Sequence, residues 1–248
     1  NSVLGARTNR TGAGVAVCAA LTGRMPKYGL YMEENRRATV KITVEATLSD
    51  LDYNTLGILV GKLAGTDIPA IYGIPESATN DNLKYLGAAA ASSGSVALYH
   101  AVGVTPEAFR NDPFDGKAPQ REALITRRDL DEAAQKLTTA KAGAVDLVVV
   151  GCPHYSMEEM VRVAKLLKGK KLKPGKKFWI YTTQENENML ERMGLRQHIL
   201  ASGARILAQN CLVISPLPGH YGTLMTDSGK FASYLPSEHR VELRFGSM

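Results

Sequence analysis

The chain has 248 residues, of which 44% are hydrophobic and 22% charged, and its formal net charge at pH 7 is +6. This length and apolar content allow a sizeable core, organised as one large α/β domain or two smaller ones. No signal peptide and no apolar run long enough to cross a bilayer is visible, so we expect a cytoplasmic protein. Three widely spaced cysteines, Cys18, Cys152 and Cys211, argue against a disulfide framework. Since the sequence opens on Asn1 inside a polar motif, we expect a fragment of a longer polypeptide.

The positive charge is concentrated between Glu158 and Lys177, where eight residues are basic and two acidic. The rest of the chain is neutral. No aromatic residue interrupts the basic run and no recognition motif accompanies it, which argues against a nucleic-acid site. A Lys-rich, solvated helix end that complements the helix dipole explains the run more simply.

The segment from Asn1 to Arg10 is polar or small almost throughout. Its two Asn and two Arg suit a clamp for a carboxylate or phosphate, because guanidinium groups bind planar oxyanions bidentately. A helix-capping loop with surface arginines explains the same residues equally well. The Gly/Ala-rich segment from Gly12 to Gly23 then predicts a closely packed helix, in which Cys18 is a small buried core residue.

Strands and helices alternate through the first half of the chain. Hydrophobic positions at a spacing of two predict strands, and those at a spacing of three and four predict helices that end at glycine. The alanines between Asn80 and Ala91 indicate tight contact with a neighbouring helix. The predicted elements are a strand with one wet face at 38–47, a helix at 53–64, a strand at 68–72, a helix at 80–91, a strand at 95–99 and a helix beginning at Thr105.

A loop rich in Pro, Gly and Asp, from Asn111 to Gln120, predicts a boundary between a first α/β subregion, residues 1–110, and a second, residues 111–248. After this loop the alternation becomes regular, which favours a doubly wound, mostly parallel sheet with helices on both faces. The predicted elements are strands at 122–125, 146–150, 177–181 and 203–208, and helices at 126–141, 157–168 and 184–193.

A buried strand from Asp146 to Val150 leads directly into Gly-Cys152-Pro-His154. Ser156-x-x-Glu159 then has the form of a capping box, so a helix begins at Met157. Cys152 therefore lies near a helix amino terminus, where open α/β sheets bind ligands and where the helix dipole favours a thiolate.

Cys211 follows the next strand but one. A single cysteine is most simply inert, but carboxyl ends of parallel strands meet at one edge, so Cys152 and Cys211 are expected to approach one another. Farther on, Ser228-Gly229-Lys230 offers backbone amides and an ammonium to an anion, or forms an ordinary turn with an exposed lysine.

Several long motifs resemble one known family. They are the segments Asn1–Arg10, Gly87–Leu98 and Gly103–Ala108, the tetrapeptide Gly151–His154, and the segments around Cys211 and Lys230. Together they resemble the catalytic, large-subunit part of aconitase X, essentially from end to end.

The resemblance implies a hydro-lyase of the aconitase superfamily that holds iron or an iron–sulfur cluster on cysteines. Cys152 and Cys211 match two of three metal ligands, and a Cys-Thr-Pro-Tyr-like motif before Asn1 is expected to supply the third. A swivelling domain, fused or on a small subunit, is expected to supply a serine base. The fragment alone is then an incomplete catalyst.

The expected reaction is dehydration of a small 3-hydroxy carboxylate. We place cis-3-hydroxy-L-proline slightly ahead of 5-phosphomevalonate, because the Ala-rich segment Gly87–Leu98 looks more like bacterial hydroxyproline members. An iron of the cluster would act as a Lewis acid on the hydroxyl that leaves, and Arg7 and Arg10 would neutralise the carboxylate. The expected site consists of a catalytic His154, metal ligands Cys152 and Cys211, and substrate-binding residues Asn1, Ser2, Arg7, Asn9, Arg10 and Lys230. The alternative is a non-catalytic α/β protein that binds a small molecule and whose cysteines are only packed in the core.

Overall fold

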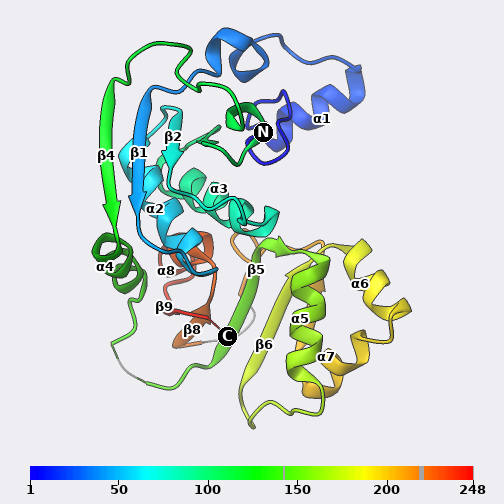
Figure 1. Ribbon diagram of the computed structural model, residues 1–248. Coiled ribbons are helices and arrows are strands. Elements are labelled where there is room, and N and C mark those ends of the chain that lie inside the picture. Colours follow the sequence, from blue (N-terminus) through cyan, green and yellow to red (C-terminus); the bar gives the residue numbers. More distant parts are fainter. Residues whose placement is uncertain (142, 218–220, 248) are drawn as a thin grey trace. The chain divides into compact units, whose positions relative to one another are not determined.

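The computed structural model describes residues 1–141, 143–217 and 221–247 (Figure 1). It divides the chain into two compact units, Asn1–Leu130 and Asp131–Met248. Each unit is built on its own parallel sheet. Within the described ranges, no helix is long and apolar enough to span a membrane.

The first unit has a four-stranded sheet in the order β3-β2-β1-β4. All of its strand pairs are parallel, with Val40 of β1 aligned with Pro69 of β2 on one side and Arg121 of β4 on the other. Inward-facing residues of β1 are buried and alternate with half-buried ones, as predicted. The strands are β1 (Val40–Glu45), β2 (Pro69–Tyr72), β3 (His100–Ala101) and β4 (Arg121–Thr126).

Helices α2 (Asp52–Ala64) and α3 (Asn80–Gly94) connect these strands and pack closely on each other. A Cβ added at Gly57 would lie 2.4 Å from the carbonyl oxygen of Leu86, and one at Gly61 would lie 2.6 Å from that of Ala90. Only glycine allows this approach, so the tight contact predicted from the alanines is confirmed. The alanines of α3 are therefore explained by helix packing.

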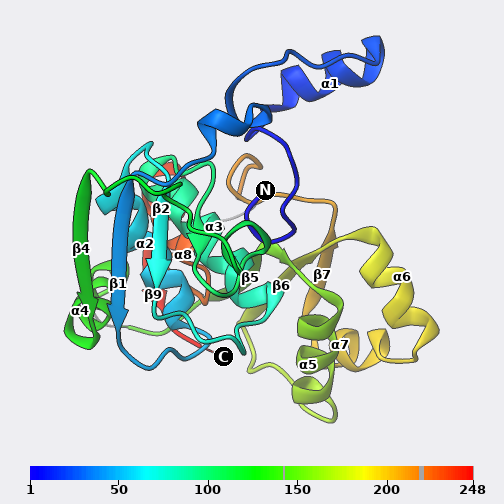
Figure 2. The ribbon, with the colours of Figure 1, turned by 45° about the horizontal axis from the view of Figure 1, so that its top comes forward.

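Helix α1 (Ala13–Thr22) confirms the helix predicted between Gly12 and Gly23, but none of its residues is buried. It extends away from the sheet of its unit (Figure 2). The prediction of close packing is wrong for the described part of the chain, and Cys18 is exposed instead of being a core residue. The helix is apolar on all sides, with Val17 and Leu21 among its exposed side chains, and no described element covers it.

The second unit has a five-stranded, wholly parallel sheet in the order β7-β6-β5-β8-β9. Its strands are β5 (Leu147–Tyr155), β6 (Lys177–Thr182), β7 (Arg205–Ala208), β8 (Thr223–Thr226) and β9 (Glu242–Phe245). Its helices are α5 (Met157–Leu167), α6 (Gln184–Arg192), α7 (Arg196–Ser202) and α8 (Gly229–His239), while α4 (Arg127–Leu137) spans the division between the units.

The order in which strands are added to this sheet reverses at β5. From β5 the chain proceeds through β6 to β7, and β8 then returns to the other side of β5. Because parallel crossovers are right-handed, α5 and α7 cover one face and α8 the other (Figure 1). The predicted doubly wound α/β fold with helices on both faces is confirmed, as two sheets instead of one. The switch between β5 and β8 is where such sheets bind ligands.

Three further expectations differ from the structure. Residues 95–99 form no strand, because α3 continues to Gly94, Ser95 caps it in the left-handed conformation and β3 begins only at His100. The helix expected from Thr105 is one 3₁₀ turn, η3 (Pro106–Ala108). The units divide after Leu130, later than the predicted boundary after residue 110, because β4 pairs with β1 and so belongs to the first unit.

Candidate active site

Gly151 shapes the carboxyl end of β5. Its φ is +92°, and an added Cβ would lie 2.1 Å from the carbonyl oxygen of Tyr181 on β6. The pairing of β5 with β6 is irregular between Val150 and Tyr155. Glycine is therefore required here by both backbone conformation and space. After it, the predicted capping box is confirmed, with the Ser156 hydroxyl accepting from the backbone N–H of Glu159 at 3.2 Å.

Cys152 lies inside β5 and is buried. Burial raises the pKa of its thiol to about 12, against the opposing effect of the nearby Lys230 ammonium. The expectation of a thiolate stabilised by the helix dipole is therefore wrong for the chain by itself. Cys152 precedes the N-cap Ser156, and the cost of desolvating a negative sulfur outweighs the helix dipole.

Cys211 follows β7 and is exposed. The ring nitrogen Nε2 of His154 lies 2.8 Å from the carbonyl oxygen of Asn210, so it donates this hydrogen bond and joins the two cysteine-bearing segments. The Cys211 thiol is near enough to raise the pKa of Cys152 further. The Nε2 atom of His154 is therefore engaged within the second unit.

Ser228 and Lys230 approach the same strand end from β8 and α8. The Ser228 hydroxyl donates to the carbonyl oxygen of Cys152 and accepts from the N–H of Phe231 at 3.0 Å, which makes it the N-cap of α8. Lys230 is the second residue of that helix. Sequence reasoning selected Lys230 as a possible anion contact but missed the contact of Ser228 with Cys152, because a cap signal does not reveal a partner on another strand.

Asp227 is a second residue that the sequence did not identify. The hydroxyl of Tyr155 donates to its Oδ2, while its buried Oδ1 has no hydrogen-bond partner among the described residues. Burial raises the pKa of Asp227 to about 6, and this hydrogen bond opposes the shift. The carboxyl borders a largely apolar cavity of about 410 Å³ that is lined by Val148 and Met225. A carboxyl whose pKa is raised by burial, and whose Oδ1 has no partner among the described residues, therefore lies beside the switch point.

Three of the predicted substrate-binding residues, Asn1, Ser2 and Arg10, line one cavity of about 230 Å³ in the first unit. Asn1 donates from Nδ2 to the carbonyl oxygen of Ala97 at 3.0 Å. Ser2 accepts from the N–H of Tyr99 at 2.9 Å. Arg10 donates to the carbonyl oxygen of Ala91 at 3.2 Å, so each side chain has a contact within its own unit.

Arg7 and Asn9 are engaged elsewhere in the first unit. Arg7 forms an ion pair with Glu33 and borders a polar cavity of about 530 Å³. The Asn9 amide accepts from the N–H of Leu30 at 2.7 Å and donates to the carbonyl oxygen of Tyr28 at 3.0 Å. These contacts hold the turn before and within η1 (Gly29–Tyr31). They support the capping-loop interpretation of Asn9, and a substrate contact there stays a prediction.

Three family models match successive parts of the chain. Residues 1–34 match the aconitase X first domain, residues 38–135 the second domain and residues 145–248 the third domain. The chain belongs to the aconitase X family. The crystal structure of Thermococcus kodakaraensis aconitase X in its holo-form covers all of this chain and 62% of its own, with a TM-score of 0.89 and 34% identity. The family predicted from the motifs is thereby confirmed.

Curated aconitase X relatives carry two different names. The phosphomevalonate dehydratase large subunit of Methanosarcina mazei is 40% identical over 100% of this chain and 59% of its own length. The cis-3-hydroxy-L-proline dehydratase of Pseudomonas aeruginosa is 38% identical over 100% of this chain and 44% of its own length. The chain thus spans 44% to 59% of the length of these two relatives.

The residues at the switch point fit an iron–sulfur group in kind, because thiolates are the ligands that such clusters use. Cys152 and Cys211 provide two sulfurs on joined segments. Across residues 1–141, 143–217 and 221–247, no group of three His, Cys, Asp or Glu side chains could hold a metal ion. The two cysteines therefore match such a cluster in donor type, and the described residues supply no third side chain beside them.

Proposed function

We propose that the complete protein is a hydro-lyase that dehydrates a small 3-hydroxy carboxylate. The observation that carries this proposal is the match of the whole chain, at 40% and 38% identity, to two kinds of dehydratase. Both names describe loss of water, so the reaction class is common to them. A non-catalytic binding protein is not favoured, because it accounts neither for these relatives nor for two thiols near one strand switch.

Cys152 and Cys211 are proposed to hold iron or an iron–sulfur cluster. Bound there, the metal would act as a Lewis acid on the hydroxyl that leaves. A bound cation would also favour the thiolate and so oppose the rise in pKa that burial gives Cys152. The third ligand is proposed to lie outside residues 1–248. The solved relative being a holo-form supports a bound group in this family.

The other side chains are assigned roles by their chemistry. Lys230, near Cys152, is proposed to bind an anionic part of the substrate, and His154 to orient or protonate the leaving hydroxyl. Asn1, Ser2, Arg7 and Arg10 are proposed to hold the carboxylate, whose charge grows as the α-proton is removed. A small swivelling subunit or domain is proposed to supply the base, and the name large subunit in the Methanosarcina relative supports such a partner.

The structure weakens the reason for ranking the two substrates. That order rests on the alanines of Gly87–Leu98, and in α3 those alanines pack against α2 near Gly57. The identities of 40% and 38% are also too close to separate the substrates. Both cis-3-hydroxy-L-proline and 5-phosphomevalonate are therefore proposed substrates. The cytoplasmic location likewise stays a prediction from the sequence.

The test uses the complete protein with any small subunit, purified without oxygen. We expect the protein to contain bound iron and to dehydrate one of the two substrates. Formation of the product measures the reaction. Cys152→Ser and Cys211→Ser should lose bound iron and lower kcat/KM by more than about 100-fold, because metal ligands matter at least as much as the residues that orient them. Cys18→Ser, on the exposed face of α1, is the matched control and should keep both iron and activity.

Two results would contradict the proposal. Absence of dehydration of both substrates by an iron-containing protein would reject the reaction. Iron content unchanged in both Cys152→Ser and Cys211→Ser would reject these residues as ligands.

A further inference from the structure

Arg36 is a buried residue of the first unit, with 2% of its side chain exposed. Its guanidinium donates to segments that are far apart in the sequence. The Nη1 group donates to the carbonyl oxygen of Leu30 at 2.6 Å. The Nη2 group donates to the side-chain oxygen of Asn1 at 3.0 Å and the carbonyl oxygen of Ala6 at 3.3 Å. One planar group therefore fixes both ends of the loop that carries Asn1, Ser2 and Arg7.

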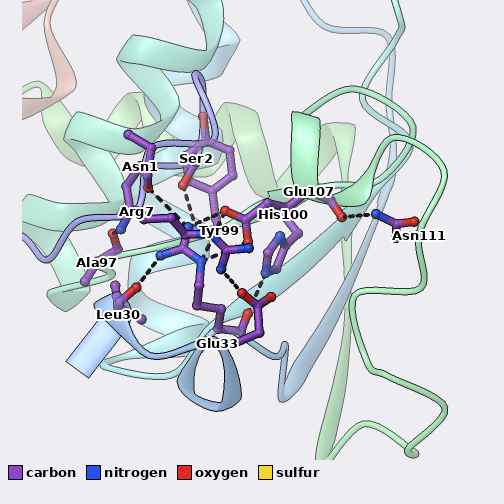
Figure 3. A network of polar contacts seen from close by, with 12 residues as sticks. Asn1, Ser2, Arg7, Leu30, Glu33, Ala97, Tyr99, His100, Glu107 and Asn111 are labelled. Carbon is purple, nitrogen blue, oxygen red and sulfur yellow. Dashed lines mark hydrogen bonds and ion pairs between the residues drawn. The ribbon is translucent and has the colours of Figure 1, made fainter. Parts of the chain in front are cut away.

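The carboxylate of Glu107, in η3, compensates this buried charge. It accepts from Nε of Arg36 at 3.0 Å and also pairs with Nη2. Burial alone would raise the pKa of Glu107, but the hydrogen bond and charge of Arg36, with the charge of Arg7, hold that pKa below its usual value. Figure 3 shows Asn1, Arg7, Glu33 and Glu107 gathered in this network.

The contact with Arg36 also sets the orientation of the Asn1 amide. Its oxygen faces Arg36, so its Nδ2 donates to the carbonyl oxygen of Ala97. The neighbouring Ser2 hydroxyl accepts from the N–H of Tyr99, two residues along the same segment. In addition, the imidazole of His100 donates from Nε2 to the carbonyl oxygen of Arg36 at 2.8 Å, which ties the backbone of Arg36 to β3. The loop that carries Asn1 and Ser2 is thus held by Arg36 and by the segment from Ala97 to Tyr99.

We infer that Arg36, paired with Glu107, is a positioning residue that aligns Asn1, Ser2 and Arg7 for substrate, an inference that rests on the proposed function. Arg36 itself touches no reacting group in this scheme. A lysine cannot replace it, since one ammonium cannot reach Glu107, Leu30 and Asn1 in the fixed geometry of a guanidinium. Misplacing a substrate-binding loop by about 1 Å costs on the order of 100-fold in rate.

The test compares Arg36→Lys, Arg36→Met and Glu107→Gln with the unaltered complete protein. We expect both Arg36 variants to lower kcat/KM on the order of 100-fold, with Glu107→Gln between them and the unaltered protein. Bound iron should not change, because Cys152 and Cys211 belong to the other unit. Amides of residues 2–9 should exchange faster with solvent, which measures the loop without reference to any substrate.

Arg121→Met is the matched control, because Arg121 also combines a carboxylate partner, Asp67, with a backbone carbonyl, that of Leu63 at 3.1 Å, but lies on β4 away from the loop. It should keep its kcat/KM and the exchange of residues 2–9.

Unchanged exchange of residues 2–9 in Arg36→Lys would overturn the inference, even if the protein acts on neither substrate. So would equal kcat/KM values for Arg36→Lys and Arg121→Met. If Arg36→Met does not fold, Arg36→Lys and Glu107→Gln carry the comparison. A failure of the reaction itself appears separately, as an unaltered protein that holds iron but dehydrates neither substrate.

Discussion

The sheets of the two units are wound in the same way, but the side chains at their switch points differ in how well their polar groups are paired. In each sheet the chain proceeds from the first strand through two neighbours and then returns to the other side of that first strand. At the end of β1 and β4, Arg127 pairs with Asp52 at 2.7 Å, and Asp52 also accepts from the N–H and hydroxyl of Ser49. At the end of β5 and β8 lie a buried thiol, Cys152, and a carboxyl, Asp227, whose Oδ1 has no partner among the described residues.

Topology alone therefore does not make a site. A switch point provides a place where two strand ends diverge, and the residues there decide its use. In the first unit the charges satisfy one another, and in the second the burial of Cys152 and Asp227 raises both pKa values. Polar groups kept buried with incomplete compensation are typical of functional sites, because a fold gains no stability from them.

The largest effect is expected at Gly151. Gly151→Ala would place a Cβ 2.1 Å from the carbonyl oxygen of Tyr181, so β5 and β6 must separate where the candidate site is built. We expect a loss of more than about 3 kcal/mol of unfolding free energy. Fluorescence of Trp179, the single tryptophan and a residue of β6, measures this in the second unit.

Gly169→Ala is the control for Gly151→Ala, because its φ of +72° is also positive but no atom lies within 4 Å of the added Cβ. Backbone strain alone should cost it about 1 kcal/mol. Equal losses in the two variants would show that the strand contact at Gly151 is unimportant.

The next effect is the pH dependence of Asp227. Because its pKa in the folded protein, about 6, lies above the ordinary 3.8, the folded state binds the proton more tightly. The stability of the second unit should therefore fall as pH rises from about 4 to about 6 and then level off. Asp227→Asn removes this fall and should gain on the order of 2 kcal/mol at pH 7, again measured by Trp179 fluorescence.

Asp146→Asn, in the same unit, is expected to act in the opposite direction. Backbone N–H groups of Thr223 and Gly222 hold the pKa of Asp146 below its ordinary value, so its carboxylate stabilises the fold at neutral pH. A loss of stability at pH 7 in Asp227→Asn would contradict burial as the dominant influence on the Asp227 carboxyl.

The sequence predicted those parts of the fold that have local signals. Ser156 with Glu159 marks the start of α5, and Gly65 marks the end of α2. It failed at residues 95–99, because the tertiary contact of Ser93 with the carbonyl oxygen of Ile58 at 3.2 Å helps to hold α3 in place near its end. The presence of two sheets was also hidden, since regular β/α alternation is the same for one sheet or two.

The candidate site likewise contains some residues that local sequence signals locate and others that they do not. Cys152 and Cys211 follow strands that the pattern locates, so their approach could be predicted, whereas the strand before Lys230, β8, was not predicted. The pair of Arg36 and Glu107 joins residues 71 positions apart, and no local pattern links them. The contact of Ser228 with Cys152 and the burial of Asp227 depend on the order of strands, which the sequence did not supply.

The smallest effect, and the one that completes the comparison, is expected at Asp52. Burial by itself raises the pKa of Asp52, but hydrogen bonds from Arg127 and Ser49 outweigh it and lower that pKa. The carboxylate therefore stabilises the first unit above its ordinary pKa of 3.8, and this stabilisation is lost as pH falls through the lowered pKa. Asp52→Asn should cost about 1 kcal/mol of unfolding free energy at pH 7, after allowance for solvent screening, measured by amide exchange in β1 and α2.

Glu122→Gln, which breaks the more exposed pair with Lys41, is the control and should cost close to nothing. Asp52→Asn and Asp227→Asn should thus change the stability at pH 7 in opposite directions. Changes of the same sign would contradict the contrast between paired charges at the first switch point and a buried carboxyl with a raised pKa at the second.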